Sequence, residues 1–562
     1  MPRHARAAVG NPSRRVGVPR TADRLQHGLL RARGLLGRTL SVNDLAPQAA
    51  IDVTGAAQDL VLGLMSMPWG QVSPSVYETG RLVTLAPWLT GHGERVRWLI
   101  DTQRSDGGWG APDGYGLVPS LSATEALLSV LRRGDDAGVD EETLREAAAR
   151  GLRRLSRCLS GARMSLPDMP AIELIVPSLV TLINEHIEEN GMSAALALPA
   201  GMSAAPLKAV RAWLASEAEI PQKLLHALEI AGDAANGAAV VHVTEIGTVG
   251  ASPAASAAWL GDRGPSEPGH PVRWHLEAIV RRHGGPVPVG LPITVFERGW
   301  VLSWLARAGI PFDVPPEMLA DLRAAIGPEG TPAGAGLPPD ADTTSVALYA
   351  LALLGVPYEP DSLWAFETPT HFCTWQGEEG SSVSVNAHVL DTFGQYVAVR
   401  PAESARYAPA IGKLSAWLLE RQREDGSWDD RWHASPYYAT VSCSLALHEF
   451  GGPGAVPAVR AAVEWVLDTQ REDGSWGRWT GTAEETAYAL QLLMFAGSGE
   501  RVRDAAARGY AYLLRVADVA EGPPLWHDKD LYRPLAVVRA AVLAAIHLAQ
   551  SRSLGVRPIS QV

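Results

Sequence analysis

The chain has 562 residues and a formal net charge of −12, with 46% hydrophobic and 20% charged residues. This length predicts more than one domain and a large core, and the negative charge disfavours nucleic acid as a partner. Cys158, Cys373 and Cys443 form no CxxC pair, so they provide no metal framework and fit a reducing, cytoplasmic location. No apolar run reaches the roughly 18 residues of a spanning helix, which predicts no integral membrane segment.

The first 50 residues fall into two segments of different composition. Residues 1–20 are rich in arginine and lack the apolar core of a secretory signal, which predicts a disordered tail. Residues 21–50 carry leucines at helical spacing, from Leu25 to Leu40. This pattern predicts a helix that packs on a later part of the chain.

A seven-residue pattern, Gln-x-x-Asp-Gly-x-Trp, occurs three times. The copies are Gln103–Trp109, Gln422–Trp428 and Gln470–Trp476, and each follows an apolar helical segment. In each copy we expect the glutamine near a helix end, the Asp-Gly pair in a tight turn and the tryptophan packed back on the preceding helix. Such repeats, with apolar spacings of three and four elsewhere, predict an all-α fold built as a helical array.

A pair of acids follows a loop rich in glycine and proline. Asp340 and Asp342 lead into the apolar segment Val346–Leu351, after a predicted domain change near residues 285–295. One interpretation is a helix cap, since acids favour the positive end of a helix. The other is an acid–base pair, because a buried carboxyl beside a like charge resists ionisation and can stay protonated.

Taken together, the repeats and the acid pair resemble the class II terpene cyclases. The repeats are similar to that family's QW motifs, and Asp340–Thr344 resembles its DxDD motif in a DxDTT variant. Other stretches are similar to bacterial members that form drimane and diterpene skeletons: Pro74–Thr79, Ser384–Leu390, Arg431–Tyr438, Ala483–Tyr488 and Leu525–Tyr532. The resemblance covers roughly residues 54–545.

The resemblance implies two α/α double-barrel domains, called β and γ, with the active site between them. In that family γ is inserted after the first helix of β. The implied division here is a tail at 1–20, the first β helix at 21–50, γ at 51–289 and the rest of β at 290–562.

The resemblance also implies roles for the acids. An isolated alkene is a very weak base, so its proton donor must be strong, dry and well aimed. The family assigns the proton to Asp342, with Asp340 as its partner and Asn386 hydrogen-bonded to the acid. Thr343 stands where the family has its third acid, and a hydroxyl can bond a carboxyl without adding charge.

A reaction that starts with a proton forms a carbocation and leaves the diphosphate in place. Aromatic faces stabilise cations, although core packing is the alternative role for each of the candidate wall residues. These candidates are Trp300, Trp304, Trp364, Phe366, Trp375, Tyr437 and Tyr438. The diphosphate needs cations or Mg²⁺. The resemblance implies Lys529 and Arg431 as diphosphate ligands and Asp168, Glu173 and Glu78 as Mg²⁺ ligands.

The expected partner is therefore a small-molecule prenyl diphosphate. We slightly favour farnesyl diphosphate, giving drimenyl diphosphate, because the bulky Trp304 and Trp375 would shorten the pocket. The alternative is geranylgeranyl diphosphate, giving a labdane, halimane or clerodane skeleton. The sequence has no DDxxD cluster, so no class I activity is expected.

Other classes of protein stay open at this point, as does the final deprotonation. A squalene–hopene-type cyclase shares the repeats and the acid, while a non-catalytic helical toroid or a zinc-dependent prenyltransferase subunit shares the helices. The terminating base is also open among His388, His433, Tyr437, Tyr438 and a bound water.

Overall fold

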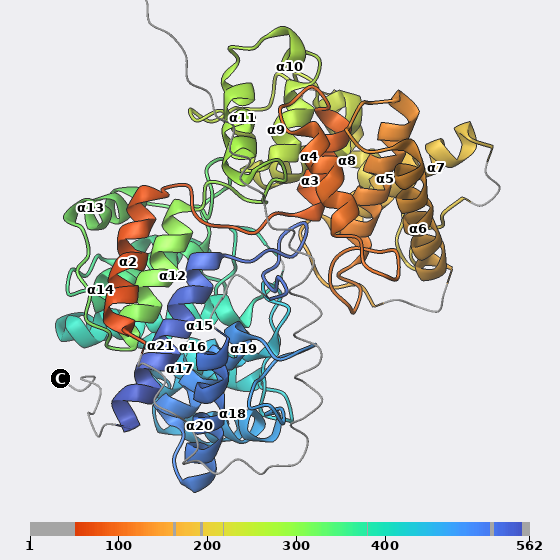
Figure 1. Cartoon of the computed structure of the whole chain (residues 1–562). Helices are drawn as coiled ribbons and strands as arrows, with labels where there is room; N and C mark the ends of the chain where they lie inside the picture. The colour runs from red at the N-terminus through yellow and green to blue at the C-terminus, as the bar shows by residue number, and fades with distance from the viewer. Residues whose placement is uncertain are drawn as a thin grey trace, which may run out of the picture. The chain divides into compact units, whose positions relative to one another are not determined.

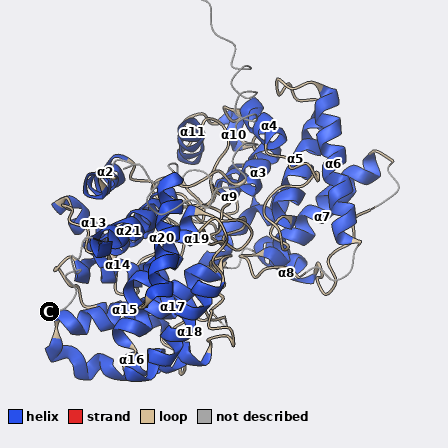
Figure 2. Cartoon of the chain, turned by 60° about the horizontal axis from the view of Figure 1, so that its bottom comes forward, coloured by secondary structure: helices blue, strands red, loops and turns tan. Residues whose placement is uncertain are grey.

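The computed structural model describes residues 51–160, 165–191, 195–216, 219–378, 380–516 and 522–553. Helices dominate these ranges, and Figure 2 draws no strand in them. The all-α prediction is therefore confirmed for the described residues. The predicted tail at 1–20 and the predicted helix at 21–50 lie outside them.

In the later half, the inner helices form a closed ring in which each contacts the next and the last contacts the first. Their order is α12 (Thr294–Arg307), α14 (Ala341–Leu353), α15 (Val383–Val399), α17 (Pro436–Phe450), α19 (Ala483–Ala496) and α21 (Leu535–Ser553). Most of them are buried on nearly all sides. This explains why their sequences are apolar almost throughout.

A second layer of helices packs on the outside of this ring. It contains α2 (Val53–Ser66), α13 (Pro316–Ala325), η4 (Pro360–Phe366), α16 (Ser404–Glu420), α18 (Val456–Asp468) and α20 (Glu500–Arg515). The α-helices of this layer bury one face and expose the other, as amphipathic helices do.

Helix α2 corrects one predicted domain boundary. We expected residues 51–289 to form the inserted domain. Instead Val53, Ala57, Leu60, Val61 and Leu64 share one helix face, and this face belongs to the core of the later half. Figure 1 shows α2 beside α12 and α21, which it contacts. The early core comprises residues between Tyr77 and Val287, and Leu291 already belongs to the later core.

The early half repeats the same architecture. Its inner ring is α3 (Val76–Leu85), α5 (Leu117–Arg133), α7 (Ile172–Glu189), η3 (Gln222–Ala235) and α9 (Pro253–Leu260). Outside it lie α4 (His92–Asp101), α6 (Glu141–Leu159), α8 (Ala205–Ala215), α10 (Arg263–Ser266) and α11 (Pro271–His283). The described chain therefore contains two double-layered helical barrels, as the resemblance implied.

The three repeats have one common geometry. In the first, Gln103 Nε2 donates to the carbonyls of Gly107 (2.9 Å) and Ala147 (3.0 Å), and Trp109 Nε1 donates to Leu99 O at 2.7 Å. The repeat thus ties the end of α4 to α6. The other two copies make the same contacts from α16 to α18 and from α18 to α20. The predicted packing of each tryptophan on the preceding helix is confirmed.

Each repeat also requires its glycine. Gly107, Gly426 and Gly474 have φ values of 90°, 94° and 89°. A Cβ atom at these positions would lie 2.5–2.7 Å from a carbonyl oxygen of the next outer helix. A side chain is therefore excluded both by backbone conformation and by space.

Helix α21 is the one described helix that is long and apolar enough, over Leu535–Arg552, to cross a membrane. Within the structure 67% of this stretch is buried. It contacts both α19 and α12 and so closes the inner ring. Its position in a protein core accounts for its composition.

Candidate active site

A cavity of about 370 Å³ is lined by segments from both halves of the chain. The early half contributes the start of α7 and part of η3, and the later half contributes Asp340, Asp342 and several aromatic rings. Its volume and its apolar walls with a few polar groups are typical of ligand pockets.

Asp340 ends the loop before α14 and caps that helix. Its Oδ1 accepts from the backbone N–H of Thr343 at 2.6 Å, and its Oδ2 accepts from that of Ala333 at 2.9 Å. The residue is 4% exposed. Burial raises the pKa of Asp340 to about 7 against the effect of the Thr343 hydrogen bond, and Asp342 adds to the rise. Both interpretations of the pair thus apply to Asp340, which is a cap and also resists ionisation.

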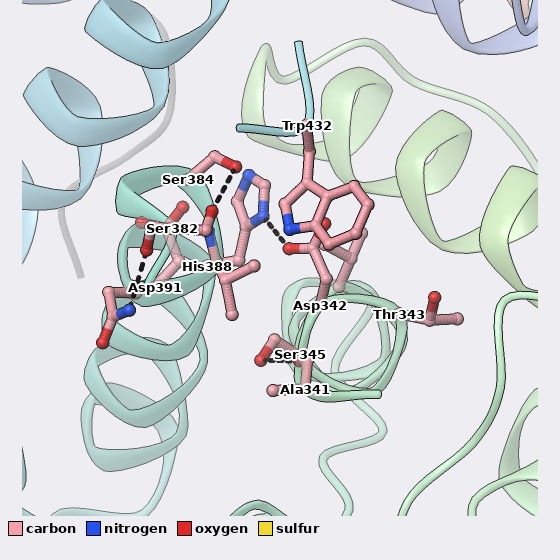
Figure 3. Close-up of polar contacts among 12 residues, drawn as sticks. Ala341, Asp342, Thr343, Ser345, Ser382, Ser384, His388, Asp391 and Trp432 are labelled. Carbon is pink, nitrogen blue, oxygen red and sulfur yellow. Dashed lines mark hydrogen bonds and ion pairs between the residues drawn. The ribbon is translucent and has the colours of Figure 1, made fainter. Parts of the chain in front are cut away.

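Asp342 lies in the first turn of α14 and lines the cavity. His388 Nδ1, from α15, lies 2.6 Å from Asp342 Oδ1. Figure 3 shows the His388 ring and the Trp432 ring next to Asp342. Burial opposes protonation of His388, but Asp342 outweighs it, so the pKa of His388 is raised. His388 is thus placed to stabilise a negative charge on Asp342 by an ion pair.

Asn386 does not make the expected hydrogen bond to the acid. Its Nδ2 donates to the carbonyls of Phe372 (3.0 Å) and Ser382 (2.8 Å), and its Oδ1 accepts from Phe372 N–H at 2.8 Å. Both amide hydrogens are therefore committed to the backbone. His388, from the same sequence motif, occupies the position beside Asp342 that we assigned to Asn386.

The two threonines of the motif have separate roles. Thr344 Oγ1 donates to Asp340 O at 2.6 Å and accepts from Thr331 N–H at 2.9 Å, so it binds backbone only. Thr343 lines the cavity, and the hydrogen bond from its backbone N–H lowers the pKa of Asp340 against the larger effect of burial. Where the resembling family has a third acid, this chain therefore has an uncharged side chain at the cavity.

Two predicted wall residues, Trp375 and Tyr438, line the cavity. Sequence reasoning missed four other rings there: Phe296, Trp432, Trp526 and Tyr532. The Trp526 ring lies 4.8 Å from Tyr438 and 5.8 Å from Phe296, measured between centroids. The motif Leu525–Tyr532 contains two of these rings, Trp526 and Tyr532, and is the sequence signal that could have identified them.

The remaining predicted wall residues pack outside the cavity. Trp364 stacks on Phe393 at 5.0 Å, and Phe366 is fully buried in the core. Tyr437 packs on Trp465 at 4.6 Å. For these three, the alternative of ordinary core packing is correct.

Trp300 and Trp304 lie behind the cavity wall. Trp300 stacks on Phe296 at 4.3 Å and donates from Nε1 to the Tyr438 hydroxyl at 3.0 Å, so it supports two lining residues. Trp304 borders a separate small pocket together with Arg307. Because Trp304 does not line the cavity, it does not shorten it, and half of the argument for farnesyl diphosphate is lost.

The structure places Lys529 and Glu78 away from the cavity, in contrast to their predicted roles as ligands of the diphosphate and Mg²⁺. Lys529 Nζ lies 2.6 Å from Glu78 Oε1 and 2.9 Å from Glu229 Oε1, and all three residues are buried. It also donates to Ser252 Oγ and to His226 O. The ammonium group is thus surrounded by protein acceptors, and neither it nor Glu78 lines the cavity. The pair joins the segment after α20 to the early barrel and is not placed to bind a diphosphate or Mg²⁺.

The exposed charged residues of the cavity mark where it opens to solvent. Asp168, Glu173 and Lys223 are exposed and line it, and sequence reasoning missed Lys223. Arg431 also lines it and forms ion pairs with Glu378 and, at 3.2 Å, with Asp168. These cations are suitable partners for a diphosphate.

The carboxylates at this opening suit a Mg²⁺ ion that protein and substrate bind together. Mg²⁺ usually binds one or two carboxylates together with substrate phosphates. Asp168 and Glu173 provide two such carboxylates on one segment. No group of three or more His, Cys, Asp or Glu side chains able to hold a metal occurs in the described ranges. The donor set therefore suits a Mg²⁺ ion that the substrate helps to hold.

Comparisons with known proteins agree with this geometry. The squalene-hopene cyclase C-terminal domain family matches residues 378–532. The ent-copalyl diphosphate synthase of Streptomyces sp. (strain KO-3988) is 42% identical over 504 residues, covering 88% of this chain and 96% of the relative. The labda-7,13-dienyl diphosphate synthase of Streptomyces clavuligerus is 40% identical over 539 residues, covering 92% and 97%.

A solved structure gives the same result. The ent-copalyl diphosphate synthase from Streptomyces platensis superimposes with a TM-score of 0.85 at 45% identity, covering 89% of this chain and 99% of that chain. Similarity of this extent includes both barrels. The protein therefore belongs to the class II terpene cyclases and is an enzyme that performs an intramolecular cyclisation.

Proposed function

We propose that the enzyme converts geranylgeranyl diphosphate into a bicyclic diphosphate with a labdane-type skeleton. The observation that carries this proposal is one cavity lined by Asp342, by a set of aromatic rings and by Lys223 and Arg431. Relatives named copalyl and labda-7,13-dienyl diphosphate synthases, at 40–45% identity, favour this substrate over the farnesyl diphosphate that we preferred from the sequence.

In the proposed reaction Asp342 donates its carboxyl proton to the terminal alkene of the substrate. The resulting cation is attacked by the neighbouring alkenes, so that two new carbon–carbon bonds close the rings. A base then removes one proton from the bicyclic cation, and the product is an isomer of the substrate that retains its diphosphate. The carboxylate left on Asp342 is stabilised by His388, whose Nδ1 lies 2.6 Å away.

The charged opening would hold the diphosphate end of the substrate. Lys223 and Arg431 would contact the phosphate oxygens, and Asp168 and Glu173 would hold Mg²⁺. Bound Mg²⁺ would supply positive charge that neutralises the diphosphate. The aromatic lining excludes water and presents π faces to the carbocation.

The test is to incubate the purified protein with Mg²⁺ and, separately, with geranylgeranyl diphosphate, farnesyl diphosphate and squalene. Products are dephosphorylated and identified by mass spectrometry. We expect a bicyclic C20 alcohol from the first reaction and little product from the others. A C15 bicyclic product alone would restore the farnesyl interpretation, and a hydrocarbon from squalene would favour the squalene–hopene interpretation.

A further inference from the structure

A buried carboxylate lies directly behind the aromatic wall of the cavity. Glu484, in the first turn of α19, is 1% exposed. Its Oε1 accepts from Trp526 Nε1 at 2.8 Å and from the Tyr488 hydroxyl at 3.1 Å, and it lies 3.2 Å from His433 Nε2. Glu484 does not itself line the cavity, whereas Trp526 does. The indole therefore separates the carboxylate from the substrate.

All the polar contacts of Glu484 are with hydrogen-bond donors. An indole nitrogen only donates hydrogen bonds. The Ser435 N–H donates to His433 Nδ1 at 3.0 Å, so the proton of the neutral imidazole is on Nε2 and faces Glu484. Three donors thus converge on one carboxylate oxygen. An ionised carboxylate, which only accepts, satisfies all of them, and we take Glu484 to be in this form.

This charge has no strong cationic partner. Among the described residues, no lysine or arginine forms an ion pair with Glu484, and its Oε2 has no hydrogen-bond partner. Burying such a charge is unfavourable, although the N-terminus of α19 offsets part of the effect. A nearby positive charge would stabilise the Glu484 carboxylate. The carbocation of the proposed reaction is such a charge, and it forms in the cavity on the other side of Trp526.

We propose that Glu484 is a positioning residue that stabilises the carbocation through Trp526. The hydrogen bond to Nε1 fixes the plane of the indole and increases the electron density of its π face. The buried charge adds a direct attraction, because the intervening space is occupied by apolar rings and not by water. Both effects act on the cation and not on the neutral substrate, so they lower the barrier without tightening binding. This inference rests on the proposed function.

Glu485 offers a matched control on the same helix turn. It is also 1% exposed, but its carboxylate accepts from Ser435 Oγ, from the Arg478 N–H and from Thr482 Oγ1. It does not line the cavity. Glu485→Gln therefore removes an equally buried charge that has no contact with the wall residue Trp526.

The experiment compares Glu484→Gln with Glu485→Gln by steady-state kinetics and thermal unfolding. The glutamine at 484 keeps the shape and one acceptor oxygen but removes the charge. We expect kcat to fall about tenfold or more with KM within about twofold of wild type, which is a smaller effect than direct loss of a transition-state stabiliser. Glu485→Gln should change kcat by less than about twofold. A wild-type kcat for Glu484→Gln, or equal losses in both variants, would overturn the proposal.

Trp526→Phe supplies a second, independent test. Phenylalanine keeps an aromatic face but removes the N–H donor, so kcat should fall while KM changes little. In this background Glu484→Gln should lower kcat by less than about a further threefold, because the part of the effect that passes through the indole N–H is already lost and only the direct attraction remains. Undiminished loss in the double variant, or a wild-type kcat for Trp526→Phe, would contradict the proposal. Failure of the wild-type enzyme to convert geranylgeranyl diphosphate would instead refute the proposed function.

Discussion

Two charged clusters in this enzyme, one around Asp342 and one around Lys529, both come from motifs that the sequence suggested as functional, but they have different roles. Asp342 lines the cavity, and its described side-chain partner is His388. Lys529 lies outside the cavity, and its three hydrogens meet carboxylate, hydroxyl and carbonyl acceptors. A charged residue in a motif is thus available for chemistry only if it reaches the cavity and its bonding capacity is not used up by the protein.

The first prediction concerns the cavity side of this comparison. Asp342→Asn removes the acidic proton but keeps an oxygen that can accept from His388 Nδ1. We expect kcat to fall by about 10³-fold or more, since positioned acids contribute about 10² to 10⁴ and an amide cannot protonate an alkene. Thermal unfolding should be nearly unchanged. Substantial activity in the folded variant would show that another group donates the proton.

The second prediction concerns the buried cluster around Lys529. Lys529→Met leaves Glu78 and Glu229 buried without their cation, which should destabilise the protein by about 3 to 5 kcal/mol. Urea unfolding measures this effect. At temperatures where the variant is folded, its KM for the diphosphate substrate should match that of wild type.

A partly exposed lysine gives the control for that variant. Lys413 pairs with Glu367 at 2.6 Å near the surface. Lys413→Met should cost about 1 kcal/mol or less, as exposed pairs do. If Lys529→Met were equally mild and raised KM, Lys529 would be a diphosphate ligand after all.

The third prediction, with the smallest expected effect, is that the free energy of unfolding depends on pH through the ion pair of His226 and Asp528. His226 Nε2 lies 2.7 Å from Asp528 Oδ1, and both residues line the cavity. Burial lowers the pKa of His226, but Asp528 raises it more, so the folded-state pKa lies above the ordinary value. The stabilisation is therefore complete below about pH 6.5, the pKa of an unfolded histidine, and is lost as pH rises through the folded-state pKa.

The variant His226→Gln makes this dependence measurable. We expect wild type to exceed the variant in unfolding free energy by about 1.5 to 3 kcal/mol near pH 6, the range for a hydrogen bond to a charged group. The difference should shrink towards pH 9. A difference that stays constant or grows between these values would show that His226 is neutral in the folded enzyme.

Most of the fold could be predicted from the sequence, because each repeat is a short, continuous stretch of the chain. Gln103–Trp109 and its two copies each contain the turn and the ring that packs back, so the pattern specifies the contact. The acid pair was also readable, since Asp340 and Asp342 stand at the junction of a loop and an apolar helix. The sequence could not show which side chains are buried by segments that are distant in the chain.

Lys529 illustrates that limit. Its partners Glu78 and Glu229 are 451 and 300 residues away in the chain (529 − 78 and 529 − 229), so no local pattern shows that it is enclosed. The same holds for the aromatic residues. Trp304 lies in an apolar segment and Trp526 stands beside charged residues, yet it is Trp526 that the packing of the barrel places in the cavity wall.

The closure of the later barrel by α21 has a consequence for biosynthesis. The early ring, from α3 to α9, is complete by residue 260, so that barrel can fold while the rest of the chain is still being translated. Helix α2 is made before it but has its packing partners in α12 and α21. The part of its apolar face that packs on α12 can be covered once residue 307 has been made, but the part that packs on α21 stays exposed until the end of α21 is available. A pause in translation before α21 is complete would therefore prolong the exposure of apolar surface on α2, which favours aggregation.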